Sequence, residues 1–337
     1  MKIDRLDLLL INAPARLGVY GALSPLSAIE PPVWAGLIAK YCLARGFSVQ
    51  ILDAEAEGLT VNETAVRIVE AAPRLAAFCI YGHQPSASTQ CMPAASAVCR
   101  LLNDELKGRA LLGKPSSIAT LALGTHPSAL PERTLREEPF DYVCQGEGPA
   151  TVLGLLKRGP ERIAGVLEVP GLWLDGDPGD LIHSQPAQNV LDLDAELPGQ
   201  AWDLLDMKRY RAHNWHLWTA KHEQIYKWRP SHDWGHVGGR DIWYERGKPL
   251  GGYASVQTSL GCVFACQFCC IQAPFGDASP RMRYWSPENV VGQISELVER
   301  HGITNVKIPD EMFALNRAHV KAICNGLIER GLGDRLN

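Results

Sequence analysis

The sequence lacks the long apolar runs, the charge imbalance and the secretory features that identify several classes of protein. No hydrophobic stretch approaches the length needed to cross a bilayer. A formal net charge of −4, with acidic and basic residues mixed, leaves no footprint for nucleic-acid binding. Lys2 and Arg5 precede the apolar residues 8–11, an order that superficially suggests a signal peptide. Asp4 and Asp7 interrupt the N-terminal stretch, however, so residues 8–11 suit a first buried strand better.

Two phosphate-binding patterns and a disulfide framework are absent as well. No G-x-G-x-x-G follows the first predicted strand and no G-x₄-G-K-[ST] occurs, which argues against NAD and the usual nucleotide phosphates. Asp53, at the end of the second predicted strand, could contact a ribose, but this signal is weak without the glycines. The 10 cysteines are scattered along the chain, so we expect free thiols and a reducing, cytoplasmic location.

The first half of the chain has the pattern of an α/β domain. Short apolar runs alternate with helical patterns, which predicts a parallel sheet covered on both faces, as in doubly wound Rossmann-like or flavodoxin-like domains. The predicted strands are residues 6–13, 48–54, 75–81, 118–124 and 142–145. The predicted helices are residues 33–45, 61–71, 90–106, 130–137 and 151–157.

The loops after four of these strands are rich in glycine, proline and small polar residues. They cover residues 12–32, 82–86, 124–128 and 146–149. A tight strand-to-helix turn explains any one of them, but four at one edge of a sheet predict a ligand crevice.

The 337 residues are enough for more than one core, and we expect three parts, residues 1–158, 159–252 and 253–337. The middle part is a connector with a β-hairpin at 171–184. A Trp/His-rich segment follows at 213–236, without a histidine pair at a convincing metal-ligand spacing; it suits a packed inter-domain segment or a flap over the active site.

The last part predicts a strand, a helix, a second strand and a second helix. The strands are expected at 253–258 and 305–309 and the second helix at 317–330. The first helix should begin with Ser286 as N-cap and Pro287 at its first position, and end at Gly302. This is the order of the first quarter of a (β/α) barrel, in which chemistry lies at the carboxyl ends of the strands.

Cys262, Cys266 and Cys269 form a C-x₃-C-x₂-C pattern after the first of these strands. Three thiolates can hold three irons of a cubane cluster and leave the fourth iron open to a ligand. Zinc is the alternative, but it needs a fourth ligand, and no second C-x₂-C or histidine pair lies close by. The neighbouring Cys270 is interpreted as structural.

The C-x₃-C-x-Phe-C loop resembles that of the radical SAM superfamily. The resemblance implies that the three cysteines ligate a 4Fe–4S cluster and that S-adenosylmethionine (SAM) chelates its open iron. It also implies SAM contacts from Phe268, near the adenine, and from Asp310 and Glu311, near the methionyl amino group or the substrate. Phe268 could instead fill the base of the loop, and the acidic pair could cap the next helix.

The first half of the chain resembles the cobalamin-binding domain that precedes many radical SAM enzymes. The resemblance is carried by residues 31–36, 53–58, 124–131 and 146–148. It implies cobalamin contacts from Asn12, Ser86, Gly124, Thr125, His126, Gly146 and Glu147.

The D-x-H-x-x-G motif, by which many cobalamin proteins supply a lower histidine ligand, is absent from the loop after the first strand. Asp53-x-Glu55-x-x-Gly58 mimics its spacing without the histidine. We therefore expect a base-off cobalamin without a histidine ligand from that motif. His83 or His126 could approach the corrin, although each also suits a loop-stabilising role.

Together these resemblances imply a cobalamin-dependent radical SAM methyltransferase acting on an unactivated carbon or phosphorus centre of a small molecule. A reducing partner such as flavodoxin or ferredoxin is implied, and no nucleic acid. A cyclase or rearrangement enzyme, or a fragment that retains only cobalamin binding, is the alternative. A methylthiotransferase would need a second cysteine triplet. Since the chain ends at Asn337 after two predicted barrel strands, we expect a fragment of a longer protein or completion by a partner chain.

Overall fold

The computed structural model describes residues 5–82, 87–113, 117–160, 165–176, 180–212, 252–264, 266–276 and 281–336. Outside these ranges it describes only the short paired strands β8 (Tyr244–Glu245) and β9 (Lys248–Pro249). His83, Ser86 and the Trp/His-rich segment 213–236 therefore lie outside the described residues.

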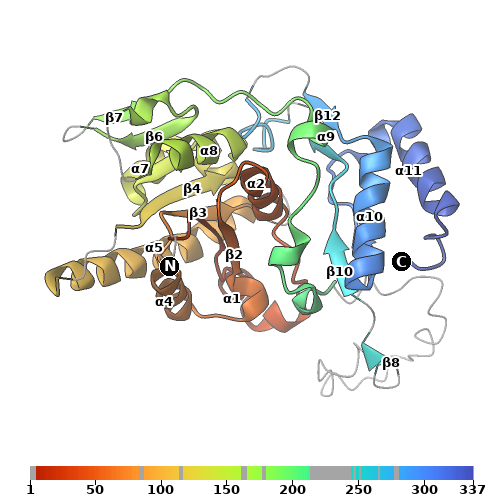
Figure 1. Ribbon diagram of the computed structural model, residues 1–337, viewed down its shortest axis with the longest axis horizontal. Coiled ribbons are helices and arrows are strands. Elements are labelled where there is room, and N and C mark those ends of the chain that lie inside the picture. The colour runs from red at the N-terminus through yellow and green to blue at the C-terminus, as the bar shows by residue number, and fades with distance from the viewer. Residues whose placement is uncertain are drawn as a thin grey trace.

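A seven-stranded sheet organises the first half of the chain, in the order β2-β1-β3-β4-β5-β6-β7 (Figure 1). Its strands are β1 (Leu8–Asn12), β2 (Val49–Asp53), β3 (Leu75–Ile80), β4 (Ala119–Gly124), β5 (Tyr142–Cys144), β6 (Leu172–Asp175) and β7 (Leu181–His183). The first five pair in parallel and the last two antiparallel. The order 2-1-3-4-5 is that of flavodoxin-like domains, so the predicted α/β class is confirmed.

Both faces of the sheet are buried, and successive side chains of each strand point to opposite faces. The strands therefore contribute to two hydrophobic cores. In β1, Leu8 and Leu10 join one hydrophobic core, and Leu9 and Ile11 join the other. The helices α2 (Val33–Leu43) and α8 (Pro149–Arg158) pack on the first core. The second is covered by α4 (Val61–Ala71), α5 (Ala87–Leu111) and α7 (Pro131–Glu137). This arrangement explains why the strands read as continuous apolar runs in the sequence.

Several shorter elements lie within segments that the sequence pattern left as loops. After β1 the chain forms α1 (Arg16–Tyr20) and the 3₁₀ helix η1 (Gly21–Leu26). After β2 and β4 it forms α3 (Ala54–Glu57) and α6 (Thr125–Ala129). The remaining short helices are η2 (Val166–Glu168), α9 (Leu193–Glu196), η3 (Trp202–Leu204), η4 (Met207–Arg209) and η9 (Phe313–Leu315).

The predicted strand–helix–strand–helix order of the last part is confirmed. Strands β10 (Gly252–Ser255) and β13 (Ile303–Lys307) pair in parallel, and α10 (Pro287–His301) connects them. Ser286 caps α10 by accepting a hydrogen bond from the Asn289 amide at 3.1 Å, and Gly302 ends it in the left-handed region. Helix α11 (Arg317–Glu329) packs beside α10 at the far end of the molecule (Figure 1).

The cysteine loop does not leave β10 directly, as the predicted strand 253–258 implied. β10 ends at Ser255, and a second short strand, β11 (Ser259–Gly261), pairs antiparallel with β12 (Met282–Tyr284). The chain leaves the β10 ladder here because the amide of Thr258 donates to the Asp310 carboxylate at 2.8 Å instead. The cysteine loop is thus held between two paired strands.

The connector contacts both halves of the structure. The Gln200 amide nitrogen donates to the Ser255 carbonyl at 3.0 Å, and Ala201 N donates to the Gly36 carbonyl at 3.1 Å. The buried Trp285 donates from its indole nitrogen to the Leu197 carbonyl at 2.6 Å. None of the helices in the described part of the chain is both long and apolar enough to cross a membrane.

Gly124→Ala should destabilise the sheet edge, because Gly124 has a φ of +143° and an added Cβ would lie 2.1 Å from the Ile80 carbonyl oxygen. We expect a loss of roughly 3 kcal/mol in the free energy of unfolding, measured by urea denaturation. The matched control is Gly108→Ala, at an exposed position of α5 where an added Cβ meets no atom within 4 Å. That variant should gain about 0.5–1 kcal/mol. Equal effects of the two variants would contradict the close backbone approach at Gly124.

Candidate functional site

A cavity lies where the carboxyl ends of the parallel strands face the segment that carries the cysteines. From the sheet it is lined by Asn12 at the end of β1, Tyr81 after β3 and Thr125 after β4, and by Trp34 of α2. From the last part of the chain it is lined by Gln257, Ser259, Gly261, Ile271, Phe275 and Glu311, among others. The two halves of the chain therefore share one cavity, at the edge where doubly wound domains bind ligands.

Aromatic rings form one wall of this cavity. Trp34 stacks on Tyr81 with ring centroids 5.0 Å apart, and Phe275, from the loop after the cysteines, lies 6.3 Å from Trp34. The Tyr81 hydroxyl donates to the Glu147 carbonyl at 3.2 Å. Burial raises the pKa of Tyr81, so the hydroxyl stays protonated and keeps this hydrogen bond at neutral pH.

A buried carboxylate, Asp53, lies behind the predicted contact residue Asn12. The Asn12 amide donates to one oxygen of Asp53 and the Tyr210 hydroxyl donates to the other, each at 2.8 Å. Burial raises the pKa of Asp53 to about 6, although these hydrogen bonds favour its ionised form. The Asn12 side chain is thus held in the cavity wall by a residue on the neighbouring strand.

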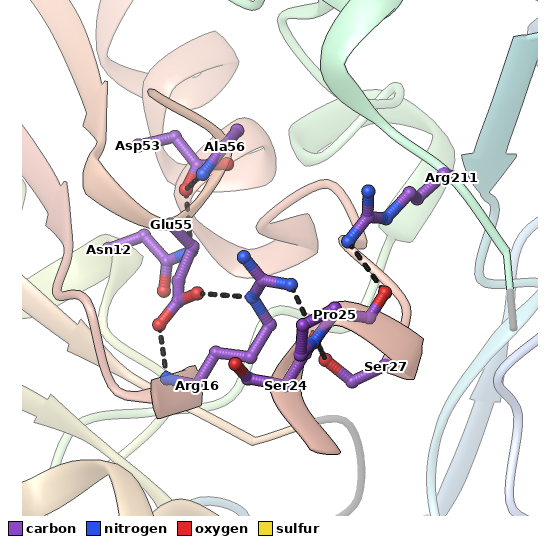
Figure 2. Close-up of polar contacts among 9 residues, drawn as sticks. All are labelled: Asn12, Arg16, Ser24, Pro25, Ser27, Asp53, Glu55, Ala56 and Arg211. Carbon is purple, nitrogen blue, oxygen red and sulfur yellow. Dashed lines mark hydrogen bonds and ion pairs between the residues drawn. The ribbon is translucent and has the colours of Figure 1, made fainter. Parts of the chain in front are cut away.

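An ion pair holds the segment between β1 and α2 against the end of β2 (Figure 2). The Arg16 guanidinium contacts Glu55 at 3.2 Å and donates to the Ser24 carbonyl at 2.7 Å. The Arg16 amide also donates to Glu55, and Arg211 of the connector donates to the Pro25 carbonyl at 3.1 Å. No local sequence pattern predicted this pair, although Glu55 falls in the Asp53-x-Glu55-x-x-Gly58 spacing that mimics a cobalamin motif.

At the end of β4, only part of the predicted group lines the cavity. Thr125 lies in its wall, whereas the His126 ring turns to α5, with Nδ1 3.0 Å from the Thr89 hydroxyl. The His126 amide donates to the Ser88 hydroxyl at 2.8 Å. Burial lowers the pKa of His126, so the ring is neutral at pH 7. This geometry supports the loop-stabilising alternative for His126.

At the end of β5, the carboxylate of Glu147 points to the last part of the chain. It forms an ion pair with Arg283 of β12, and it accepts from the Val190 amide at 2.8 Å. Gly146 is fixed by Ser128, whose hydroxyl accepts from the Gly146 amide at 3.2 Å. Neither residue is among the described residues that line the cavity. A cobalamin contact from Gly146 or Glu147 stays a prediction.

Cys262, Cys266 and Cys269 are free thiols on the loop between β11 and β12. Cys262 is buried, while Cys266 and Cys269 are exposed. The Gln272 amide braces the loop by donating to the carbonyls of Cys262 and Phe264. Within the described residues, no three metal-ligating side chains converge, so the three thiols do not form a closed site. Three free thiols on one short loop nonetheless suit the donor chemistry of an iron–sulfur cluster.

Phe268 extends from this loop with 92% of its surface exposed. The alternative that its ring fills the base of the loop is therefore wrong. The predicted contact with the adenine of SAM stays a prediction, and the exposed ring leaves a face open for such a contact.

Asp310 and Glu311 differ in their surroundings. Asp310 accepts from the Thr258 amide at 2.8 Å and from the Thr258 and Ser259 hydroxyls at 2.6 Å, which anchors the chain before the cysteine loop. Glu311 lines the cavity, and burial together with the nearby Asp310 raises its pKa. The helix-cap alternative is wrong, because Asn316 caps α11.

A second ion pair in the cavity region was not predicted. Lys307 of β13 contacts Glu30 at 2.8 Å, and the Ser255 hydroxyl donates to the same carboxylate at 3.3 Å. Glu30 lies in the segment before α2, far from Lys307 in sequence. No local pattern links the two residues, so their contact could not be predicted from the sequence.

Comparison with known proteins agrees with this geometry. The B12 binding domain family matches residues 23–156. An uncharacterized methyltransferase of Pyrococcus horikoshii is 25% identical over 306 residues, which are 90% of this chain and 53% of the relative. The anaerobic magnesium-protoporphyrin IX monomethyl ester cyclase of Synechocystis is 25% identical over 303 residues, 90% of this chain and 49% of the relative. The chain spans about half the length of these curated relatives.

Two solved structures share the fold. The cobalamin-dependent S-adenosylmethionine radical enzyme OxsB, with aqua-cobalamin and S-adenosylmethionine bound, has a TM-score of 0.61 at 17% identity, covering 97% of this chain and 37% of OxsB. The radical S-adenosylmethionine methyltransferase TsrM from Kitasatospora setae has a TM-score of 0.57 at 17% identity, covering 98% of this chain and 53% of TsrM.

The fold and the matched segment thus define a doubly wound B12-binding domain joined to a β/α unit that carries three cysteines. In fold the chain resembles the radical SAM enzymes OxsB and TsrM, and residues 23–156 match the B12 binding domain family, which confirms the resemblance drawn from its motifs.

Asp53→Asn should remove a pH dependence of stability. The folded-state pKa of Asp53 is about 6, above an unfolded value of about 3.9, so the folded chain binds the extra proton between these values. The stability of the wild type should therefore fall as pH rises through this window. Relative to the variant, we expect a loss of roughly 2 kcal/mol between pH 4 and pH 7, measured by urea unfolding.

Tyr210→Phe provides a second check on Asp53. The Tyr210 hydroxyl favours the ionised carboxylate, so its removal should raise the pKa of Asp53 further and move the window to higher pH. A window that stays in place, or that moves to lower pH, would contradict the assignment to Asp53.

Proposed function

We propose that this chain belongs to a cobalamin-dependent radical SAM enzyme that transfers a methyl group to an unactivated carbon or phosphorus centre of a small molecule. The observation that carries the proposal is the shared cavity, lined by the edge of the B12-binding sheet on one side and by the segment around the cysteine loop on the other. Cobalamin at the sheet edge and a cluster on the cysteine loop would therefore both face the same cavity.

Cys262, Cys266 and Cys269 would hold the 4Fe–4S cluster in this proposal, with SAM at the open iron. When bound, the cluster and SAM supply radical chemistry, and cobalamin supplies methyl-group chemistry. The chain's own part is to bind these groups, to orient them and to exclude water. The stacked Trp34 and Tyr81 present an apolar face that suits the last of these tasks.

The polar residues of the cavity suit an amino-acid-like ligand such as the methionyl end of SAM. Glu311 presents a carboxylate that can accept from an ammonium group. Lys307 is already paired with Glu30, so it would hold the cavity wall in place and leave Glu311 to the ligand. Asn12 and Thr125 offer hydrogen bonds from the sheet side, where the B12-binding domain would place cobalamin.

A cyclase or rearrangement reaction is the second candidate, favoured by the similarity to the magnesium-protoporphyrin IX monomethyl ester cyclase. Both candidates use the same cofactors, so the product distinguishes them. For either reaction we propose the domain bounds 1–158, 159–252 and 253–337, a reducing cytoplasmic compartment and a reductant such as flavodoxin or ferredoxin.

Each of the variants Cys262→Ser, Cys266→Ser and Cys269→Ser should lose most of the iron that the wild type takes up. Anaerobic reconstitution of the wild type should give about four irons per chain, counted with an iron chelator and checked by electron paramagnetic resonance (EPR). Cys270→Ser and Cys324→Ser are matched controls, because they remove a neighbouring thiol and an exposed thiol from outside the triplet. Iron loss in the controls equal to that in the triplet variants would contradict the assignment.

The reconstituted chain with cobalamin, SAM and a reductant should release 5′-deoxyadenosine, measured by chromatography with mass detection. Label from the methyl group of SAM should also reach cobalamin and then a product if the reaction is methyl transfer. Release of 5′-deoxyadenosine with no label on cobalamin would favour the cyclase candidate. Cobalamin binding without any SAM cleavage would show that this chain retains only the binding function, and the enzyme proposal would fail for it.

A further inference from the structure

The ion pair between Glu147 and Arg283 is the most deeply buried ion pair among the described residues. The side chain of Glu147 is 4% exposed and that of Arg283 is 3% exposed. Glu147 follows β5, at the carboxyl edge of the B12-binding sheet, and Arg283 lies in the middle of β12. The pair thus joins the predicted cobalamin loop 146–148 to the strand that closes the cysteine loop.

Both charged groups have further partners that compensate for their loss of water. The Arg283 guanidinium donates to Glu147 and to the Val190 carbonyl, and the Val190 amide donates back to Glu147 at 2.8 Å. The guanidinium also lies over the ring of Phe275, 5.4 Å from its centroid. Buried charges are tolerated when their geometry is this complete, and such pairs can select one arrangement of the chain more than they add stability.

The pair acts at the base of the cysteine loop. Arg283 lies opposite Leu260 in the β11–β12 ladder, and Met282 lies opposite Gly261, directly before Cys262. On the far side of the loop, the Asn189 amide donates to the Phe275 carbonyl at 2.7 Å. Any shift of β12 relative to the sheet would therefore move Cys262 as well.

The pair also connects to the cavity wall. The Glu147 carbonyl accepts from the Tyr81 hydroxyl, and Tyr81 stacks on Trp34. A ligand that presses on these rings would act on the backbone of Glu147. The contacts form a continuous path from the cavity wall, through Glu147 and Arg283, to the strand beside the first cysteine.

We propose that Glu147 and Arg283 are positioning residues, which fix the cysteine loop relative to the cobalamin-binding edge of the sheet. The proposal rests on the proposed function and gives Glu147 a role other than direct contact with cobalamin. Glu147→Gln and Arg283→Met leave one group buried without its charged partner, so both should release β12 from the sheet edge.

The first measurement is hydrogen–deuterium exchange on the metal-free chain, followed for residues 259–284. Glu147→Gln and Arg283→Met should each raise the exchange rate of this segment tenfold or more, while Arg283→Lys, which keeps the charge, should restore much of the protection. The control is Asp203→Asn. It breaks an exposed ion pair between the Asp203 carboxylate and the Arg300 guanidinium, 3.0 Å apart, which joins the connector to α10. It should leave exchange at 259–284 unchanged.

The second measurement is the EPR spectrum of the cluster, kept reduced by excess dithionite, with and without hydroxocobalamin; dithionite also reduces the cobalamin to cob(II)alamin, whose own signal is recorded separately and subtracted. In the wild type, the added cobalamin should change the spectrum, and in Glu147→Gln the change should be lost although iron content and cobalamin affinity are kept. If Glu147→Gln loses cobalamin affinity while exchange at 259–284 stays as in the wild type, Glu147 is a direct contact and the proposal is overturned. If the wild type takes up no iron, the proposed function fails, whereas the exchange result on the metal-free chain still decides the positioning role.

Discussion

The parallel pairing of β1 with β2 and β3 is the constraint on which the rest of the structure depends. Parallel neighbours need crossover connections, and these connections place helices on both faces of the sheet. The faces are then filled with apolar side chains, and the loops at the carboxyl edge are left to carry polar chemistry. The cavity, the Asn12–Asp53 contact and the Gly124 turn all lie at this edge for that reason.

The last part of the chain is fixed against this edge by long-range polar contacts as well as by a shared apolar core. Glu147 with Arg283, and Glu30 with Lys307, join segments that are more than a hundred residues apart. Apolar surfaces tolerate small sliding movements, whereas a charge-assisted hydrogen bond between buried groups has one favourable geometry. The orientation of the cysteine loop is therefore defined more narrowly than hydrophobic packing alone would allow.

Much of the fold could be predicted from the sequence because its signals are local. The Ser286–Pro287 start and the Gly302 end of α10 follow from backbone hydrogen-bonding needs within one turn. The strands of the sheet follow from apolar runs that are buried on both faces. The C-x₃-C-x₂-C spacing likewise identified a single loop, and the structure places all three thiols on it.

The parts that were missed depend on long-range contacts. The Gly-Glu-Gly sequence at 146–148 predicts a cofactor loop, and nothing near it indicates that the carboxylate pairs with Arg283. The strands β11 and β12 have three residues each, too few for a periodic pattern. Whether Asp310 binds a ligand or the chain itself depends on Thr258, which is distant in sequence and adjacent in space.

The antiparallel hairpin of β6 and β7 has a consequence for the mechanics of the cofactor edge. By pairing with β5, it turns a three-residue edge strand into an interior one. The Gln145 amide donates to the Gly171 carbonyl at 2.8 Å, and the Trp173 indole donates to the Gln145 side chain at 2.9 Å. Gln145, two residues before Glu147, is therefore held by the hairpin through both its backbone and its side chain. Loop 146–148 should therefore be a rigid part of the sheet, to which the Glu147–Arg283 ion pair attaches the base of the cysteine loop.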